Sequence, residues 1–290
     1  MKKAVIFVFS GTGNTLKIAN LFKEEFERNS VATQIKSIEE SVGAQIDVAG
    51  YDFIGIAYPI HAFNAPPIVL KFADGLPAAD KKAFFILKTS GEPLKLNNIS
   101  SLRLLSKLAR KGYVLTNEYH YAMPYNMIFR HSDEMAFNMW RTAKLLAPVE
   151  AREILRGEAK RLQKVPMGRP ISFAFRIEHP AMRLNGRFFK VDYDKCILCG
   201  KCARECPVGN IKLVGGRIEF GGDCVCCVRC SFNCPEDAIS IAMLNGWKVN
   251  GAYDMENPVS ENGGIHDNYC KKSYDRYFSE AFAKIESNKT

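Results

Sequence analysis

The sequence has no hydrophobic run long enough to cross a membrane. A spanning helix needs about 20 consecutive apolar residues, whereas the first apolar run, Ala4–Phe9, is six residues long and leads into Gly and Asn. It also lacks the small-residue cleavage site of a secretory signal. Hydrophobic residues make up 47% and charged residues 24%, which is ordinary for a globular protein. We therefore expect a folded cytoplasmic protein without a membrane span.

A concentrated basic patch is also missing, although the net charge is +9. A basic excess is typical of proteins that bind nucleic acid. Here the positive residues are dispersed, with short pairs such as Lys81-Lys82 and Arg110-Lys111, and no recognition motif accompanies them. We expect a solvated basic face and no nucleic-acid binding.

Cysteine is absent from the first 195 residues, and then nine cysteines lie between Cys196 and Cys234, with the tenth at Cys270. A cytosolic chain of this size disfavours disulfides, so metal or redox chemistry is the better interpretation. Charge shifts as well: residues 1–165 have 23 Lys and Arg against 16 Asp and Glu, whereas residues 191–242 have six against seven. These shifts predict the following division: a domain at 1–165, a linker at 166–190, a second domain at 191–242 and a tail at 243–290.

The first 165 residues alternate between strand and helix patterns. Buried or alternating apolar runs predict strands, and apolar residues at helical spacing predict the helices between them. The expected strands are 4–9, 31–38, 51–58, 82–88 and 113–122, and the expected helices are 14–28, 66–72, 100–110 and 132–162, the last interrupted at Pro148. Such alternation implies an α/β fold with a doubly wound, five-stranded parallel sheet.

The linker and the tail carry weaker signals. Proline and glycine punctuate residues 166–190, which indicates a tether, and its apolar stretch 171–175 is expected to dock on a domain. The tail matches no motif, but residues 274–285 could form a short helix that packs back on a domain.

Three loops follow the expected strands and carry polar or aromatic residues. The first, Ser10–Thr15, joins strand one to helix one, where hydroxyls and backbone N–H groups can bind phosphate. The alternative is a turn that simply caps the helix, and the spacing fits neither the Rossmann nor the P-loop fingerprint. The other two loops are residues 58–66, after strand three, and residues 89–93, after strand four.

The first loop resembles the FMN phosphate loop of flavodoxins, Ser/Thr-x-Thr-Gly-x-Thr, and the resemblance extends over residues 1–165. In a flavodoxin-like sheet of order 2-1-3-4-5 the ligand lies at the carboxyl ends of strands one and three. The resemblance implies FMN, bound by Ser10, Gly11, Thr12, Gly13, Asn14, Thr15, Tyr58, Pro59, His61, Phe63, Asn64, Thr89, Ser90, Gly91 and Tyr125.

The rings that flank the flavin would come from Tyr58, His61, Phe63 and Tyr125, unless some of them pack under the loops. The other histidines have no ligand spacing and are interpreted as ordinary: His120, His131, His179 and His266. Flavodoxins are typically acidic, whereas this half is basic, which favours an acidic redox partner protein.

The cysteines form two copies of the pattern C-x2-C-x2-C-x3-C-P, 28 residues apart. The pattern resembles the two-cluster bacterial ferredoxins, small α+β domains in which the fourth cysteine of each run binds the other cluster. The resemblance implies one [4Fe–4S] cluster on Cys196, Cys199, Cys202 and Cys234, and a second on Cys224, Cys227, Cys230 and Cys206. Structural zinc, which usually takes two separated pairs, is a poor match. Cys226 is interpreted as a spare thiol in the cluster shell and Cys270 as an isolated packed thiol.

Together the two halves resemble flavodoxin–ferredoxin fusion proteins. This resemblance implies an electron-transfer protein that passes electrons between two [4Fe–4S] clusters and FMN, and to or from a redox partner protein. The alternative is a flavin-dependent reductase of a small molecule or quinone that the clusters feed. A second nucleotide fingerprint and a catalytic acid–base pair are both missing, so we predict no catalytic residues and no dedicated NAD(P)H site. The sequence leaves the oligomeric state and the question of enzymatic activity open.

Overall fold

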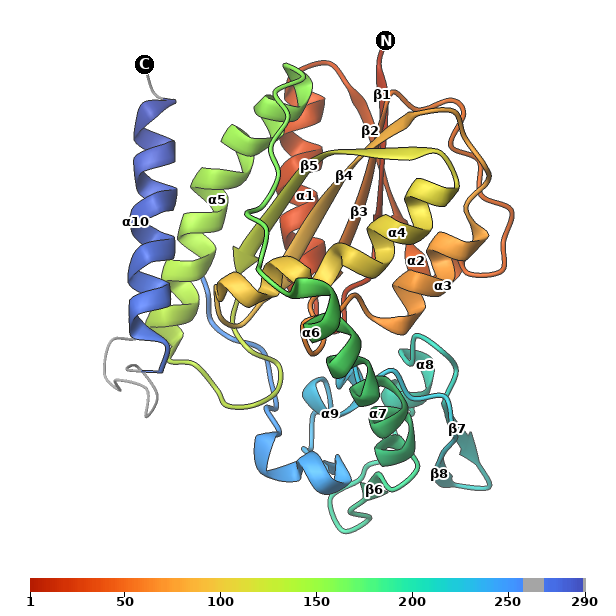
Figure 1. Cartoon of the computed structure of the whole chain (residues 1–290). Coiled ribbons are helices and arrows are strands. Elements are labelled where there is room, and N and C mark those ends of the chain that lie inside the picture. Colours follow the sequence, from red (N-terminus) through yellow and green to blue (C-terminus); the bar gives the residue numbers. More distant parts are fainter. Residues whose placement is uncertain (258–268, 289–290) are drawn as a thin grey trace. The chain divides into compact units, whose positions relative to one another are not determined.

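The computed structural model describes residues 1–257 and 269–288, and the chain divides into two compact units (Figure 1). The first unit comprises Met1–Met123, Asn138–Phe175 and Asn268–Thr290, and the second comprises Pro124–Phe137 and Arg176–Asp267. Each unit is therefore built from separate stretches of sequence. Of the expected histidines, His266 lies outside the described residues.

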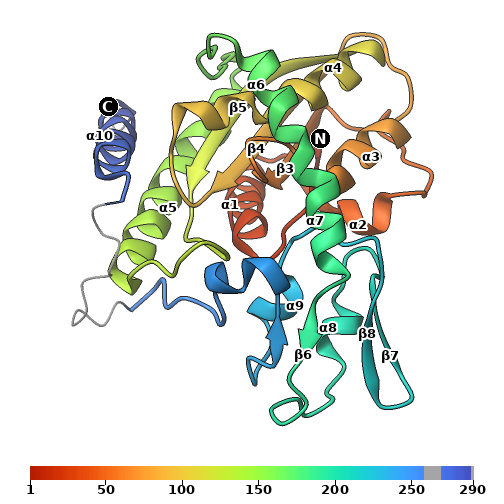
Figure 2. The same cartoon turned by 60° about the horizontal axis from the view of Figure 1, so that its bottom comes forward.

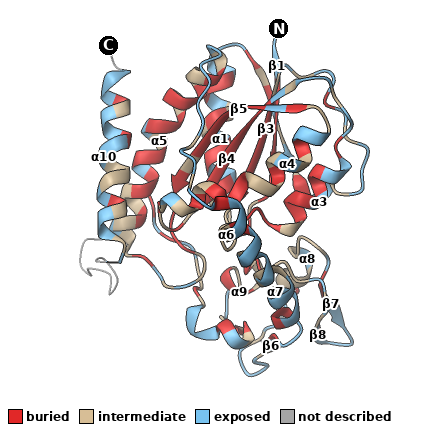
Figure 3. Cartoon of the chain, viewed as in Figure 1, coloured by how far each residue is buried: buried red, intermediate tan, exposed pale blue. Residues whose placement is uncertain are grey.

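The first unit is built on a parallel five-stranded sheet. Its strands are β1 (Lys3–Val8), β2 (Ala32–Ser37), β3 (Phe53–Pro59), β4 (Lys82–Ser90) and β5 (Tyr113–Ala122), in the order β2-β1-β3-β4-β5. Figure 3 shows buried residues along the central strands, as expected for a sheet covered on both faces. The order is that of flavodoxin-like sheets and confirms the predicted fold class.

Helices cover both faces of this sheet (Figure 1 and Figure 2). One face carries α1 (Asn14–Arg28) and α5 (Asp133–Leu155), and the other carries α3 (Pro67–Gly75), the 3-10 helix η1 (Lys95–Ser101) and α4 (Leu102–Arg110). The short α2 (Ile38–Ser41) follows β2. Phe22 of α1 stacks on Phe85 with ring centroids 6.2 Å apart, and Phe72 of α3 lies 4.8 Å from Phe7 on the opposite face.

The predicted interruption of the last helix at Pro148 is wrong, because α5 continues through this residue. A proline removes one backbone hydrogen bond and usually kinks a helix. Beyond Pro148, however, Val149, Glu150 and Ala151 are buried. Packing of this turn against the sheet offsets the missing hydrogen bond.

Residues 166–190, expected to be a tether, are largely helical. They form α6 (Gly168–Ala174), the 3-10 helix η2 (Phe175–Ile177) and α7 (Glu178–Gly186). Pro170 and Pro180 each lie in the first turn of a helix, where the missing N–H is not needed. The boundary between the units falls after Phe175, so α6 belongs to the first unit and α7 to the second.

The second unit contains short elements arranged around the cysteines. They are β6 (Lys190–Val191), α8 (Lys201–Arg204), β7 (Ile211–Val214), β8 (Arg217–Phe220), α9 (Arg229–Phe232), β9 (Ile239–Ser240) and the 3-10 helix η3 (Ala242–Trp247). β6 pairs with β9 and β7 with β8, both antiparallel. This is the small α+β arrangement that the cysteine pattern predicted.

The sequence duplication reappears in the backbone of the second unit. Helices α8 and α9 lie 28 residues apart, and so do three pairs of residues with positive φ. These pairs are Leu198 (53°) with Cys226 (51°), Gly200 (68°) with Val228 (51°), and Gly209 (61°) with Asp237 (46°). Val228 adopts a left-handed conformation that Gly200 reaches without strain. The two cysteine runs therefore fold alike despite their different residues.

The described part of the tail ends in α10 (Lys271–Ser287), a helix longer than the predicted 274–285. It lies alongside α5 in the first unit (Figure 1). Lys284 pairs with Glu150 at 3.0 Å and Glu153 at 2.8 Å. None of the helices within residues 1–257 and 269–288 has the length and apolar character that a membrane crossing requires.

Candidate functional site

The loop between β1 and α1 is organised by its own serine. The Ser10 hydroxyl accepts hydrogen bonds from the backbone N–H groups of Gly13 (3.1 Å) and Leu16 (3.3 Å). Gly13 precedes the helix at φ 103°, a conformation that favours glycine. The first turn of α1 contains no acidic residue, so the positive end of the helix dipole is not neutralised by its own side chains. Ser10 thus caps the turn, and the same loop offers a helix N-terminus suited to an anion.

A buried contact between two threonines joins this loop to the end of β4. The hydroxyls of Thr15 and Thr89 are 2.7 Å apart, and both side chains are buried. Two of the predicted FMN residues, 74 positions apart in sequence, therefore meet at the carboxyl end of the sheet.

The strand-three loop contains a tight turn with two strained residues. His61 and Asn64 exchange backbone hydrogen bonds of 3.0 and 2.8 Å, and the residues between them, Ala62 and Phe63, have φ of 47° and 54°. Two consecutive positive φ angles define a type I′ turn, which usually requires Gly or Asn. The buried Asn64 amide donates to the Ala62 carbonyl at 3.0 Å and holds the turn from inside.

The four candidate ring residues lie in different surroundings. His61 and Phe63 are half-buried, and the Phe63 ring contacts Phe175 at 4.8 Å. Tyr58 is fully buried, and burial raises the pKa of its phenol. Tyr125 belongs to the second unit, where its ring stacks on His131 at 5.0 Å. Within the first unit, the structure therefore brings His61 and Phe63 together on the strand-three loop and places Tyr58 inside the sheet.

The strand-four loop is held by hydrogen bonds that converge on Ser90. Its hydroxyl donates to the Glu92 carbonyl at 2.6 Å and accepts from the Asn97 amide at 3.0 Å. His120 Nε2 lies 2.7 Å from the same oxygen, and because the hydroxyl proton is used, Nε2–H is the donor. Burial and the charge of Lys88 lower the pKa of His120 to about 3, so its ring is neutral. The sequence interpretation of His120 as ordinary missed this contact.

A buried ion pair lies next to this loop. The Lys88 ammonium is 2.7 Å from a Glu118 carboxylate oxygen and donates to the Asn97 carbonyl at 3.2 Å. Lys88 is fully buried, and burial lowers the pKa of its ammonium while Glu118 opposes that shift. Sequence periodicity predicted β4 but gave no signal for this pair, since a charged side chain in a strand is usually solvated.

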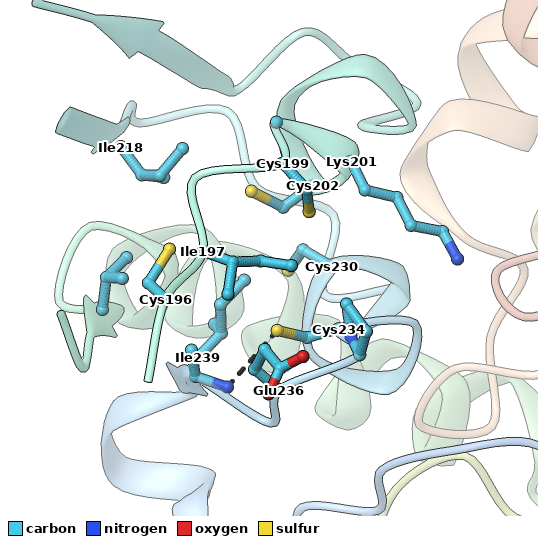
Figure 4. A pocket seen from close by; sticks show the side chains of 14 residues that line it. Cys196, Ile197, Cys199, Lys201, Cys202, Ile218, Cys230, Cys234, Glu236 and Ile239 are labelled. Carbon is cyan, nitrogen blue, oxygen red and sulfur yellow. Dashed lines mark hydrogen bonds between the residues drawn. The ribbon is translucent and has the colours of Figure 1, made fainter. Parts of the chain in front are cut away.

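The cysteines of the second unit surround two hollows. One has about 400 Å³ of empty space, part of it open to solvent, and its walls include Cys196, Cys199, Cys202, Cys230 and Cys234 (Figure 4). The other has about 370 Å³ and is lined by Cys206, Cys224, Cys227 and Cys230. Each hollow therefore has three cysteines of one run and the last cysteine of the other run, and Cys230 borders both.

Backbone N–H groups point at two of these sulfur atoms in equivalent ways. Asn210 N–H donates to Cys206 Sγ at 3.2 Å, and Ala238 N–H donates to Cys234 Sγ at 3.3 Å, four residues after the cysteine in both cases. Hydrogen bonds to sulfur stabilise thiolates and tune cluster potentials. Burial raises the pKa of Cys227 to about 12, and the backbone N–H and the charge of Arg229 oppose that shift.

The two remaining cysteines have other surroundings. Cys226 is buried in an apolar cluster with Phe189, Val228, Ile239, Ile241 and Leu244. Cys270 is half-buried at the residue before α10. Gly186, at the end of α7, packs against Cys224, which lines the second hollow: a Cβ at position 186 would lie 2.1 Å from the Cβ of Cys224.

Residues 189–212 match the family described as 4Fe-4S binding domain. No curated protein matches the chain. Similar solved structures include a flavodoxin from the domain Archaea (13% identity, 53% of this chain and 99% of that chain, TM-score 0.34). A short-chain flavodoxin associated with a non-canonical PDU bacterial microcompartment is 17% identical over 55% of this chain and 98% of that chain, with a TM-score of 0.36. NAD(P)H:quinone oxidoreductase from Methanothermobacter marburgensis is 12% identical over 53% of this chain and 96% of that chain, with a TM-score of 0.39.

The strand order of the first unit and the 4Fe-4S match in the second define the class of protein. The chain is a fusion of a flavodoxin-like part with a 4Fe–4S ferredoxin-like part. The 4Fe-4S match at residues 189–212 supports a role in electron transfer, with a [4Fe–4S] cluster as the suggested cofactor.

Proposed function

We propose that this chain is an electron-transfer protein that holds two [4Fe–4S] clusters and one FMN. It passes electrons between them, and to or from a redox partner protein. The observation that carries the proposal is the grouping of the eight motif cysteines around two hollows. Each hollow is lined by three cysteines of one run and the last cysteine of the other, and Cys230 borders both.

The hollows suit clusters better than single ions. A structural zinc ion needs four ligand atoms within about 2.3 Å of one point. Zinc sites of four cysteines usually take them as two separated pairs, whereas each hollow is lined by three cysteines of one run and the last cysteine of the other. The N–H groups of Asn210 and Ala238 add hydrogen bonds to the fourth cysteine of each run. These residues would bind the clusters and set their potentials.

The flavin part would use the three loops at the carboxyl end of the sheet. Ser10 orders the phosphate loop, Thr89 ties it to β4, and Asn64 holds the strand-three turn. When bound, FMN supplies exchange of one or two electrons, whereas each cluster exchanges one. The fusion keeps donor and acceptor at a high effective concentration.

The partner is proposed to be acidic on its docking face. Residues 1–165 contain 23 Lys and Arg and 16 Asp and Glu. Opposite charges on two docking surfaces raise the association rate, and this effect falls with added salt.

Cofactor content after anaerobic purification tests the proposal, with about eight irons and one FMN per chain expected. Paired substitutions test the crossed sets. Cys206→Ser with Cys224→Ser removes two ligands of one cluster, so about four irons stay. Cys206→Ser with Cys196→Ser removes one ligand from each cluster, so iron falls toward zero. The reverse pattern would show that each run binds its own cluster.

Internal electron transfer is tested by rapid reduction of the clusters in the holoprotein. The rate at which FMN is then reduced is expected to be independent of protein concentration, since donor and acceptor share one chain. A rate proportional to concentration would exclude internal transfer. Steady turnover of a quinone without any partner protein would instead favour a reductase.

A further inference from the structure

The last helix of the chain contacts the strand-four loop of the first unit. The Tyr274 hydroxyl of α10 donates to the Gly91 carbonyl at 2.5 Å, across 183 positions of sequence. Tyr274 is 3% exposed and Gly91 is buried. This contact therefore joins the tail, to which the sequence assigned no role, to one of the three loops proposed to bind FMN.

The charge of Glu92, in the same loop, contributes to the pKa shifts of two residues that precede α10. Burial raises the pKa of Tyr269, and the charges of Cys270 and Glu92 add to that shift. Burial also raises the pKa of Cys270, and the charge of Glu92 adds to it. The contact that joins α10 to the loop is the hydrogen bond from Tyr274 to Gly91.

The other end of α10 is fixed to the sheet through α5. Lys284 pairs with Glu150 and Glu153, and Glu153 accepts a 2.8 Å hydrogen bond from Tyr119 of β5. Glu150 accepts a hydrogen bond from Tyr121, also on β5. Because the helix is anchored to the sheet nearly three turns beyond Tyr274, the position of the Tyr274 hydroxyl is fixed relative to β4 and β5.

We propose that Tyr274 is a positioning residue of the flavin site, whose hydroxyl holds the Gly91 carbonyl and so fixes the strand-four loop around FMN. The inference rests on the proposed function, because it requires FMN at these loops. A glycine peptide has more rotational freedom than any other, so an external donor restricts it most. The next carbonyl, that of Glu92, is already held by Ser90 and Asn97.

In a planar trans peptide, the direction of the Gly91 carbonyl determines the direction of the Glu92 N–H. The described backbone contains no cis peptide bond, and in a trans peptide the C=O and the following N–H point in opposite directions. Holding the Gly91 carbonyl on Tyr274 therefore keeps its negative end turned toward α10. Without the hydroxyl, the carbonyl can turn toward the flavin, where its dipole disfavours the reduced, more negative form.

The test compares Tyr274→Phe with Tyr51→Phe in the full chain. Tyr51 precedes β3, at the opposite end of the sheet, and its hydroxyl also makes one hydrogen bond, to Gln34 at 2.8 Å. Loss of one hydrogen bond changes binding by about 3- to 10-fold. We expect Tyr274→Phe to weaken FMN binding by this factor, and to weaken binding of reduced FMN more than that of oxidised FMN. Tyr51→Phe is expected to change neither, and the iron content of both variants is expected to stay at the wild-type value.

Fluorescence titration measures the affinity for oxidised FMN, and a redox titration then gives the ratio of the two affinities. A thermal unfolding curve separates a structural effect from a positioning effect. If Tyr274→Phe lowers stability but leaves both affinities unchanged, the inference is overturned. If the wild-type chain does not bind FMN, the proposed function itself fails. If the wild-type chain binds FMN and Tyr274→Phe binds oxidised and reduced FMN with the same affinities as the wild type, only this inference fails.

Discussion

The Ser172 hydroxyl donates to Oδ1 of Asn64 at 2.9 Å, joining residues 108 positions apart. Asn64 is fully buried and also donates to the Ala62 carbonyl at 3.0 Å. Left-handed backbone costs a non-glycine residue roughly 1–2 kcal/mol, and the turn contains two such residues, Ala62 and Phe63. The contact with α6 therefore supports a turn that its own sequence does not favour.

Replacing Ser172 with alanine is expected to destabilise the first unit. The Asn64 carbonyl oxygen would lose its hydroxyl donor in a buried position, which costs about 1–3 kcal/mol. Urea unfolding followed by fluorescence of Trp140, in a Trp247→Phe background, measures the change in the first unit. Ser106→Ala is the control, since that exposed hydroxyl meets only Arg110 of its own helix among the described contacts, and its expected effect is within about 0.5 kcal/mol. Equal effects of the two substitutions would contradict a supporting role for Ser172.

Sequence patterns predicted the sheet well because its strands are buried on both faces. Continuous apolar runs located β1 and β3, and β5 has the predicted bounds, 113–122. The patterns failed where proline was interpreted as a helix breaker. Pro170 and Pro180 begin helices and Pro148 lies inside one, and only tertiary packing decides between these outcomes.

The two candidate sites also differ in how much of each can be predicted from the sequence. Cysteine spacing is local and repeated, so it is readable from the sequence, and its resemblance to the ferredoxin pattern implied two crossed sets of four cysteines. The contacts that hold the flavin loops are long-range, as between Tyr274 and Gly91 or His120 and Ser90. Sequence spacing contains no information about such contacts, because they depend on which strands and helices become neighbours.

Gly186→Ala is expected to remove one cluster and leave the other. A Cβ at this position would lie 2.1 Å from the Cβ and 2.8 Å from the Sγ of Cys224, so the cysteine must move. We expect about four irons per chain instead of eight. Gly246→Ala is the matched control in the same unit, since no atom lies within 4 Å of a Cβ there. An unchanged iron content in Gly186→Ala would show that α7 can shift away from the hollow.

Cys226→Ser is expected to keep both clusters. Its side chain lies in the apolar cluster with Phe189 and Ile241, so a hydroxyl there costs about 1–3 kcal/mol of stability without removing a ligand. Cys227→Ser, one residue further on, is expected to lose about four irons because Cys227 lines the second hollow. Iron analysis and the midpoint of urea unfolding separate the two effects. Loss of iron from Cys226→Ser would instead make Cys226 a ligand.

Glu92→Gln is expected to change how the stability of the first unit depends on pH. Burial raises the pKa of Glu92 from 4.5 to about 7, so between these values the folded chain keeps a proton that the unfolded chain releases. Its contribution is present below about pH 4.5 and is lost as the pH rises through 7. Glutamine cannot ionise, so the variant avoids this loss and gains stability relative to the wild type between pH 5 and pH 8.

The half-buried His120 affects the pH dependence of stability with the opposite sign, because desolvation and the charge of Lys88 lower its pKa to about 3 and its contribution is lost as the pH falls. His120 is present in both proteins, so its effect cancels when Glu92→Gln is compared with the wild type at each pH. Urea unfolding of the first unit, followed by Trp140 fluorescence at pH 5, 6, 7 and 8, measures the difference. A difference in unfolding free energy that stays constant over this range would mean that Glu92 is ionised throughout, and that the folded chain does not exclude water from its carboxylate.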